Sequence, residues 1–263
     1  MTIELKKVGQ TAPPPLISVV CAWFNRADFI RETLDSLLAQ EGCNDFEIVV
    51  VNDGSPDPRV KDIFESYDDS RIRVIHQENT GFVRAIGRAV SESKGKFVAI
   101  QGAGDVCSPQ RLALQSNALL QDHEAALVGA GILNVLVRGN DRTPIREIRP
   151  CRSVYTQADL LRRNPLSHGE VMFRRSIYEA VGGYRPVFTR AQDRDLWIRI
   201  TAHGHIRMIS DVLYERRIFV QEGIAASFSS RATQGAFSAL AVGCEKDQST
   251  LGNDVVAEFS DDA

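Results

Sequence analysis

The sequence lacks several features that would assign it to common protein classes. No apolar run approaches the length of a transmembrane helix, so nothing predicts a membrane-spanning synthase. Basic residues are not in excess, because 31 Lys and Arg stand against 34 Asp and Glu, which argues against a protein that coats nucleic acid. The five cysteines form no C-x-x-C pair, so we expect free thiols rather than a disulfide framework or a zinc site.

Three motifs for nucleotides and nucleophiles are also missing. A dinucleotide site needs G-x-G-x-x-G directly after the first strand, and the sequence has no glycine there. The pair Gly102 and Gly104 has Cys107 where a third glycine would stand. A Walker phosphate loop and a G-x-S-x-G elbow are absent too, which disfavours dehydrogenases, P-loop enzymes and serine hydrolases of the common kinds.

The first half of the chain contains a regular alternation of buried strands and amphipathic helices. Short apolar runs predict strands at 16–22, 46–51, 72–76, 97–100 and 126–130. Apolar residues at helical spacing predict helices at 27–40, 60–67, 81–93 and 109–123. This order, with short connections, predicts an α/β fold with a mostly parallel sheet and helices on both faces.

The second half is less regular and is expected to form a smaller, irregular part of the same domain. Turn residues at 139–141 predict a hairpin between 132 and 148. Helices are expected at 157–163, 176–181 and 193–202, with a strand at 169–174. We expect residues 1–15 to be a disordered lead-in, 16–221 a single domain, and 222–263 a partly disordered extension with a helix near 232–242.

Polar residues follow three of the predicted strands at the point where each strand ends. The first strand runs into Asn25, the second into Asp53 and the fourth into Gly104 and Asp105. Ligands of open parallel sheets bind outside the carboxyl ends of the strands. If these strands are neighbours, the three segments line one crevice.

The order of several short motifs is more specific than any one of them. They are Phe24-Asn25-Arg26, Glu32–Gln40, Val49–Ser55, Asn79-Thr80-Gly81, Lys94–Asp105 and Gln192–Arg199. In this order they resemble the family 2 glycosyltransferases of GT-A fold, over about residues 16–217. The resemblance implies a nucleotide-sugar-binding half at 16–130 and an acceptor-side half at 131–221.

The resemblance assigns several residues to the donor, which is often a UDP-sugar in this family. Asp53 matches the acid that accepts a hydrogen bond from the nucleotide base, which a carboxylate does strongly. The alternative is that Asp53 caps its own turn. Asn25 and Gly104 are expected beside the donor. Arg84 is expected to reach the diphosphate, or else to be a solvated arginine on a helix face.

Asp105 matches the acid that holds a divalent cation, Mn²⁺ or Mg²⁺, against the two phosphates of the donor. Such a cation needs only one or two protein carboxylates when phosphates and water complete its shell. The usual motif has further acids where this chain has Gly102 and Gly104. A helix cap is the alternative role for Asp105.

Asp193 matches the catalytic base that takes the proton from the acceptor hydroxyl as it attacks the anomeric carbon. The sugar would then have inverted stereochemistry. The alternative is that Asp193 only begins a helix, where acids are favoured. His168 and Gln192 are expected on the acceptor side, on weaker grounds.

The sequence thus predicts a cation-dependent, inverting hexosyltransferase that acts on a glycan or lipid-linked acceptor in polysaccharide assembly. We expect it in the cytoplasm, with peripheral association at the inner face of the membrane as one option, and no nucleic acid as partner. A nucleotidyltransferase is a first alternative, although such enzymes open with a glycine-rich basic loop. A non-catalytic nucleotide-sugar-binding module is a second, motivated by the two glycines before Asp105.

Overall fold

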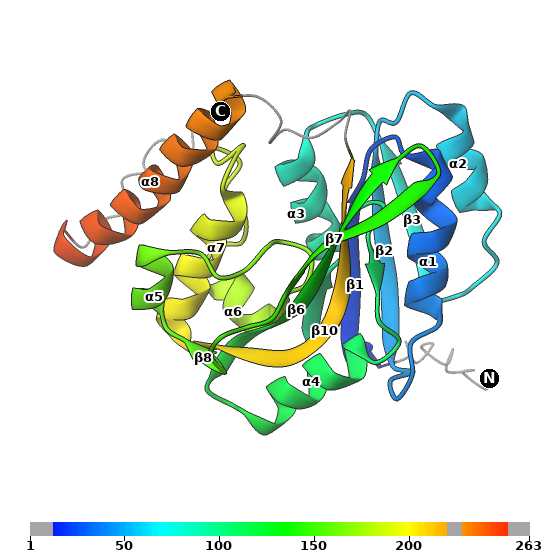
Figure 1. Cartoon of the computed structure of the whole chain (residues 1–263). Coiled ribbons are helices and arrows are strands. Elements are labelled where there is room, and N and C mark those ends of the chain that lie inside the picture. Colours follow the sequence, from blue (N-terminus) through cyan, green and yellow to red (C-terminus); the bar gives the residue numbers. More distant parts are fainter. Residues whose placement is uncertain (1–12, 220–227, 252–263) are drawn as a thin grey trace, which may run out of the picture.

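The computed structural model describes residues 13–219 and 228–251 (Figure 1). The strands are β1 (Ile17–Trp23), β2 (Phe46–Asp53), β3 (Ile72–Gln77), β4 (Phe97–Ile100), β5 (Val106–Cys107), β6 (Ala125–Arg138), β7 (Asp141–Ile148), β8 (Val154–Tyr155), β9 (Met172–Arg174) and β10 (His205–Phe219). The α-helices are α1 (Ile30–Leu38), α2 (Pro58–Glu65), α3 (Phe82–Glu92), α4 (Arg111–Gln121), α5 (Gln157–Arg162), α6 (Arg175–Ala180), α7 (Gln192–Ile200) and α8 (Phe228–Leu251). Short 3-10 turns lie at Ala27–Phe29 and Thr201–His203.

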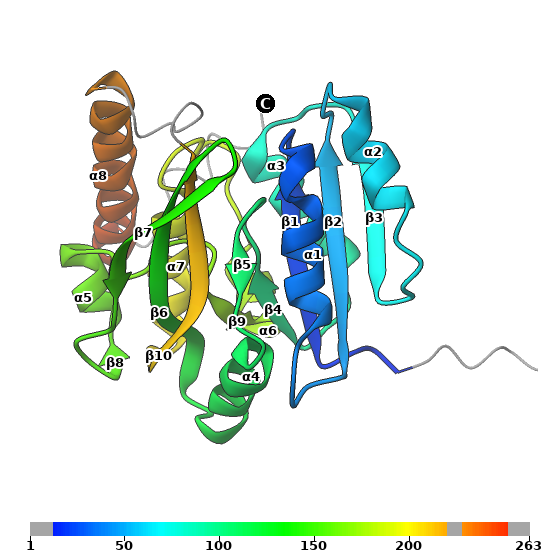
Figure 2. The same ribbon diagram turned by 45° about the vertical axis from the view of Figure 1, so that its right-hand side comes forward.

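The strands form one sheet in the order β3-β2-β1-β4-β9-β6-β10-β5, with β7 added to β6 and β8 to β10. The strands β3, β2, β1 and β4 are parallel, as predicted, whereas β9 runs antiparallel to both of its neighbours. All seven residues of β1 are buried, because helices cover the sheet on both faces (Figure 2).

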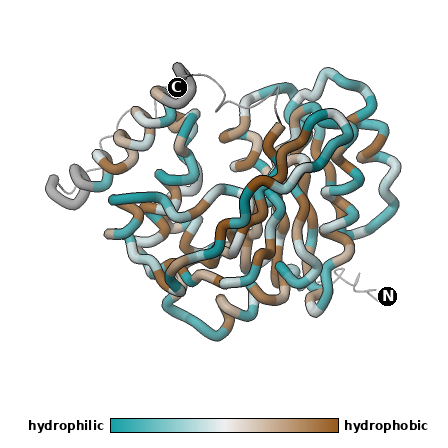
Figure 3. The backbone as a smooth tube through the Cα atoms, viewed as in Figure 1, coloured by the Kyte–Doolittle hydropathy of each residue, from teal (hydrophilic) through white to brown (hydrophobic). Residues whose placement is uncertain are grey.

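Two apolar clusters fill the two layers between the sheet and its helices. One cluster joins the strands to α3, α6 and α7, and the other joins them to α1, α2 and α4. Along β1, Val19 and Cys21 belong to one cluster and Val20 to the other, as the two-residue period of a strand requires. Hydrophobic colour is accordingly concentrated in the central strands (Figure 3).

The strands β6 and β10 run in parallel for most of their length. The predicted strand at 126–130 and the first arm of the predicted hairpin are one continuous strand, β6, and β7 returns antiparallel after a turn at 139–140. The sequence analysis assigned no strand to residues 205–219. This strand, β10, brings Tyr214, Arg217 and Phe219 to the region where β4 ends.

The C-terminal helix is longer than expected, since α8 covers 228–251 instead of 232–242, and it packs against α7. Residues 1–12 and 252–263, which fall within segments predicted to be disordered, lie outside the described residues. Within the described ranges, no helix is both long and apolar enough to cross a membrane.

Candidate active site

The ends of β2, β1 and β4 meet at one edge of the sheet, because the three strands are adjacent and parallel. The backbone N–H of Asn25 donates to Ser55 Oγ at 2.8 Å, which joins the β1 loop to the β2 loop. Arg26 Nη1 donates to the carbonyl oxygen of Ala103 at 2.7 Å, which joins the β1 loop to the β4 loop. The convergence expected from the sequence is therefore present.

The loop after β1 holds an unusual backbone conformation. Asn25 and Arg26 both have φ of 57°, a left-handed conformation that costs non-glycine residues about 1–3 kcal/mol each. The bond to Ser55 and a bond from the Trp23 indole N–H to the carbonyl of Asn25 hold the loop in place. The side-chain Oδ1 of Asn25 is buried and has no hydrogen-bond partner among the described residues. It is a ready acceptor for a ligand N–H or O–H.

Asp53, the predicted contact to the nucleotide base, is 3% exposed and supports the next loop. Its Oδ1 accepts from Gln77 Nε2 at 2.7 Å and from the N–H of Thr80 at 2.8 Å. Its Oδ2 accepts from the N–H of Gly81 at 3.0 Å, directly before α3. A carboxylate has about four acceptor sites, so most are already used by the protein. Contact with a base remains a prediction.

Arg84, the predicted diphosphate contact, is exposed on the first turn of α3. It makes no hydrogen bond or ion pair with the rest of the described chain. This agrees with a solvated arginine on a helix face, and it also leaves the guanidinium accessible to a ligand. Gly104 has φ of 89°, and a Cβ there would lie 2.9 Å from the Phe219 ring. Backbone conformation and close packing therefore both favour glycine at this position.

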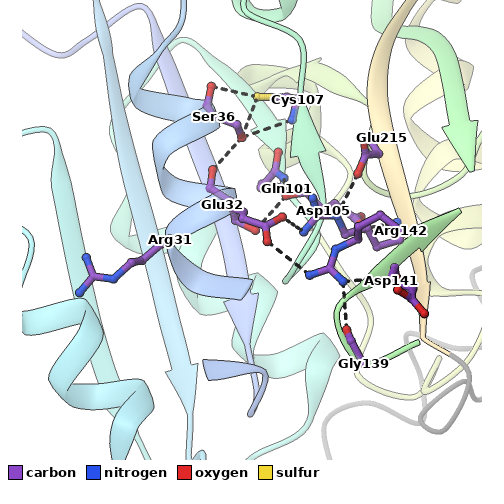
Figure 4. A network of polar contacts seen from close by, with 12 residues as sticks. Arg31, Glu32, Ser36, Gln101, Asp105, Cys107, Gly139, Asp141, Arg142 and Glu215 are labelled. Carbon is purple, nitrogen blue, oxygen red and sulfur yellow. Dashed lines mark hydrogen bonds and ion pairs between the residues drawn. The ribbon is translucent and has the colours of Figure 1, made fainter. Parts of the chain in front are cut away.

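Asp105 is turned inward, beneath the loop that it ends (Figure 4). Its Oδ2 accepts a hydrogen bond from the hydroxyl of Tyr214 at 2.6 Å, and its Oδ1 accepts from the N–H of Arg217 at 2.7 Å. Burial raises the pKa of this carboxyl, while these two donors and the nearby Arg26 oppose that shift. The carboxylate is 8% exposed as a residue and connects the β4 loop to β10.

These contacts leave only part of the Asp105 carboxylate for a divalent cation, because each oxygen already accepts one of its about two hydrogen bonds. A Cβ at Gly102 would overlap Asp105 Oδ2, so an acid there would displace Asp105 from its present place. Gly104 supplies no ligand either. No group of three or more His, Cys, Asp or Glu side chains that could hold a metal occurs in the described part of the chain. What remains is one buried carboxylate whose two oxygens already accept protein hydrogen bonds.

Asp193 lies at the first turn of α7, after Ala191, whose φ of 52° turns the chain into the helix. Burial raises the pKa of Asp193, and the N–H of Arg194 opposes the shift. Asp195 differs, because it is 2% exposed and its carboxylate pairs with Arg199 at 2.5 Å, which makes it structural. Gln192, also predicted on the acceptor side, is half-buried at the start of α7.

His168 is surrounded by the aromatic rings of Phe82, Tyr184 and Trp197. Its Nε2 is 2.7 Å from the hydroxyl of Tyr184, and its ring centroid is 5.3 Å from that of Phe82, which directly follows Gly81. Burial lowers the pKa of His168 to about 4, so the ring is neutral at pH 7. Burial raises the pKa of Tyr184, and the nearby Tyr178 and Asp193 add to this rise. These contacts join the acceptor-side residues to the loop that Asp53 supports.

A family comparison agrees with this arrangement. The model of Glycosyl transferase family 2 matches residues 18–182, which is more than half of the chain. The chain belongs to glycosyltransferase family 2. The resemblance predicted from the short motifs is thereby confirmed.

Named relatives of this family 2 glycosyltransferase differ widely in length. The putative glycosyltransferase EpsE of Bacillus subtilis is 28% identical over 195 residues, 72% of this chain and 68% of EpsE. An uncharacterized glycosyltransferase of Rickettsia felis is 27% identical over 213 residues, 80% of this chain and 35% of that protein. The O-antigen biosynthesis protein RfbC of Myxococcus xanthus is 32% identical over 234 residues, 87% of this chain and 18% of RfbC. The chain thus spans about a third or less of the length of the Rickettsia felis protein and of RfbC.

Solved structures confirm the GT-A fold predicted for this family 2 glycosyltransferase. S. aureus TarS 1-349 in complex with UDP-GlcNAc gives a TM-score of 0.68 at 17% identity, covering 86% of this chain and 65% of that fragment. The mannosyltransferase PcManGT of Pyrobaculum calidifontis, in complex with GDP-Man and Mn²⁺, gives 0.61 at 23% identity, covering 89% of this chain and 66% of that one. At these identities the likeness concerns the fold alone.

A buried arginine behind the strand ends of this glycosyltransferase was missed by the sequence analysis. Arg111 is fully buried at the start of α4, and its Nη2 donates to the carbonyls of Ile100 and Gly169, both at 2.8 Å. Its guanidinium lies 4.8 Å from the centroid of the Tyr214 ring. Arg111 therefore packs against Tyr214, the tyrosine that donates to Asp105. The sequence indicated only that Arg111 lies near the start of a helix.

A second missed group closes the same edge from the side of the β6–β7 hairpin (Figure 4). Arg142 Nη1 donates to the carbonyl of Gly139 at 3.0 Å, and its Nη2 pairs with Glu32 at 3.3 Å. Arg217 pairs with the same Glu32 and, at 2.9 Å, with Glu215. This shared ion pairing fixes the hairpin and the end of β10 against α1.

Proposed function

We propose that the protein transfers a sugar, with inversion, from a nucleotide-sugar donor to an acceptor hydroxyl, with Asp193 as the general base. Family membership supports the transferase class. The observation that carries the finer proposal is the setting of Asp193, whose partly buried carboxylate has a raised pKa and makes no ion pair among the described residues. Asp195, two positions on, is held by Arg199 and offers no comparable group.

The proposed step is a direct displacement at the anomeric carbon. The acceptor oxygen forms a bond to that carbon while the bond from the carbon to the phosphate oxygen breaks, and its electron pair leaves with the nucleoside diphosphate. The acceptor proton passes to Asp193. A base works best when its pKa lies near the working pH, so the burial that raises the pKa of Asp193 suits this role.

The donor is proposed to lie across the ends of β1, β2 and β4, beside Gly104. Asn25 supports this placement, because its buried Oδ1 has no partner among the described residues and can accept from the base or the ribose. Asp53 is proposed to contact the base, and Arg84, exposed on α3, to reach the donor. A UDP-sugar is the first donor to test, with GDP-sugars second, since TarS was solved with UDP-GlcNAc and PcManGT with GDP-Man.

The expected cation, Mn²⁺ or Mg²⁺ with Asp105 as ligand, stays an untested prediction. When bound, such a cation would neutralise the leaving diphosphate. Because the carboxylate of Asp105 is occupied by Tyr214 and Arg217, no step of the proposed reaction is assigned to a cation.

The acceptor is proposed to be a glycan or a lipid-linked glycan in polysaccharide assembly, at the inner face of the membrane. The name of RfbC, an O-antigen biosynthesis protein, supports this class of acceptor. His168 and Gln192 are proposed to line the acceptor side, where the neutral imidazole of His168 adds no charge at pH 7.

The test is a panel of nucleotide-sugars incubated with wild type and Asp193→Asn, with release of nucleoside diphosphate as the readout. We expect the variant to lose about 10²–10⁴-fold in turnover, the usual contribution of a positioned general base, while nucleotide binding is unchanged. Asp62→Asn, an exposed aspartate on α2, is the matched control and should keep full activity. Full activity in Asp193→Asn would place the base elsewhere.

A non-catalytic nucleotide-sugar-binding module is the second candidate, favoured by the two glycines before Asp105 and by the occupied carboxylate. It predicts nucleotide binding without turnover for every donor and acceptor tested. Turnover that depends on Asp193 would exclude it.

A further inference from the structure

The residue after the proposed base is an arginine whose side chain is held by two neighbouring helices. Arg194 Nη1 donates to the hydroxyl oxygen of Ser238 on α8 at 2.6 Å. Its Nη2 donates to the carbonyls of Leu160 at 2.9 Å and Leu161 at 3.2 Å, both on α5. Its Nε is buried and has no partner in the described part of the chain, so the contacts of the two Nη atoms fix the guanidinium.

The helix α8 that supplies Ser238 is itself fixed in the acceptor-side half. It packs against α7 and buries Ala241 (Figure 1). Gln157 of α5 donates to Glu245 of α8 at 2.7 Å and to the Ile198 carbonyl of α7 at 3.1 Å, so one side chain joins the three helices. The position of Ser238 is therefore set independently of its contact with the arginine.

The charge held in this way acts on Asp193. Burial raises the pKa of Asp193, and the backbone N–H and the charge of Arg194 oppose that rise. Burial lowers the pKa of Arg194, and the charge of Asp193 opposes that fall. A nearby opposite charge favours the ionised form of a carboxyl, and the ionised form is the one that accepts a proton.

The other titratable groups around α7 do not supply this charge. Tyr184 and His168 are neutral at pH 7, because burial raises the pKa of the tyrosine and lowers that of the histidine. Among the described residues, the side-chain charge that acts on the pKa of Asp193 is that of Arg194. The titratable side chains described on α5, on α8 and on the turn at 201–203 are Asp159, Arg162, His203, Cys244 and Glu245.

Asp195 shows what direct pairing does to a carboxylate on the same helix. It pairs with Arg199 and, at 3.5 Å, with Arg185, so its oxygens are occupied. Arg194 instead donates to α8 and α5, and Asp193 makes no ion pair among the described residues. The carboxylate of Asp193 thus has a cation nearby and still has oxygens open to an acceptor.

We propose that Arg194 is a positioning residue for Asp193, and that α8 takes part in the reaction by holding the Arg194 guanidinium through Ser238. The contact with Ser238 keeps the positive charge close to the base and also keeps it from pairing with the base. This inference rests on the proposed function, because it assumes that Asp193 accepts the acceptor proton.

The experiment is a carbon-13 NMR titration of the Asp193 carboxyl in the full chain, with the signal identified by its loss in Asp193→Asn. In Arg194→Gln the midpoint should move to higher pH, because the charge that favours the ionised form is removed. Arg194→Lys keeps the charge and should restore much of the wild-type midpoint. In Ser238→Ala the midpoint should move to lower pH, because the released guanidinium can pair with the carboxylate.

Turnover of a panel of UDP- and GDP-sugars connects this titration to the reaction. Ser238→Ala should lose about two- to tenfold in kcat, the worth of one hydrogen bond of ordinary strength, because its base is then occupied. The KM for the donor should be unchanged, since the donor is proposed to lie at the ends of β1, β2 and β4.

Two controls match these variants. Arg174→Gln removes contacts of the same kind, to the carbonyls of Leu119 and Asp122, at the start of β4 rather than at its end. It should lower Tm without moving the Asp193 midpoint. Ser91→Ala, at an exposed serine on α3, should match wild type in both assays.

Circular dichroism would establish that each variant folds, and if Arg194→Gln does not fold, Ser238→Ala carries the test. Midpoints that are unchanged in the Arg194 and Ser238 variants, or that shift equally in Arg174→Gln, would overturn the inference and leave the proposed function intact. Full turnover in Asp193→Asn, or no turnover of any donor, would overturn the proposed function and with it the role of Arg194 in the reaction.

Discussion

Replacing Tyr214 with phenylalanine tests whether Asp105 is held inside the protein. The Tyr214 hydroxyl donates to Asp105 Oδ2 at 2.6 Å and accepts from the N–H of Gly102 at 2.8 Å, and Tyr214 is 1% exposed. Loss of a hydrogen bond to a charged group costs about 1.5–3 kcal/mol, and an unpaired buried N–H adds about 1–3 kcal/mol. We therefore expect Tyr214→Phe to lower the free energy of unfolding by about 3 kcal/mol.

The assay is urea unfolding followed by circular dichroism, supported by thermal scans. A loss of about 3 kcal/mol corresponds to a fall in Tm of roughly 6–12 °C for a chain of this size. Tyr67→Phe is the matched control, because its hydroxyl also donates to an aspartate, Asp35, at 2.8 Å, but at the surface. It should cost less than about 1 kcal/mol. If Tyr214→Phe costs no more than Tyr67→Phe, Asp105 is not held by this bond and the case against its binding a cation fails.

Three further predictions concern single positions. Gly102→Ala should destabilise the protein, because the new Cβ overlaps Asp105 Oδ2, whereas Gly87→Ala on α3 meets nothing within 4 Å and should stabilise it by about 0.5–1 kcal/mol, as urea unfolding would measure. The acid limb of kcat/KM should lie above the ordinary aspartate pKa of 3.8 and disappear in Asp193→Asn, because only ionised Asp193 accepts a proton and burial raises its pKa. The pKa of His168 is about 4 in the folded protein and about 6.5 in the unfolded chain, so stability should fall by up to about 3 kcal/mol as pH drops through this interval. The free energy of unfolding, measured at about pH 7 and about pH 5, should differ less in His168→Gln than in wild type, and an equal difference would contradict the assignment.

The local pattern of the first half was sufficient to predict its elements. Fully apolar strands such as β1 and the amphipathic α3 carry their own periodicity, so these elements and the parallel sheet were predicted, whereas the order of the strands in the sheet was not. The strand β10 was missed because charged residues interrupt it. It forms by pairing with β6, whose residues lie about 80 positions earlier in the sequence.

The candidate site shows the same division. Asp53, Asp105 and Asp193 were selected from short motifs. The structure places Asp53 and Asp105 at the ends of β2 and β4, and Asp193 beside Tyr184, which contacts His168. The occupants of the Asp105 carboxylate could not be predicted, because Tyr214 and Arg217 lie on β10, more than 100 residues later. The sequence revealed that acids were missing at Gly102 and Gly104, but the overlap that explains glycine at 102 needed the structure.

The measurement that tests the central claim most directly is turnover of a nucleotide-sugar panel, with the anomeric configuration of the product followed by NMR. The account predicts release of a nucleoside diphosphate from at least one donor, an inverted product, and loss of both in Asp193→Asn. Parallel reactions with nucleoside triphosphates and sugar 1-phosphates provide the contrast. Release of pyrophosphate from these, with no nucleotide-sugar consumed, would identify a nucleotidyltransferase and contradict the account.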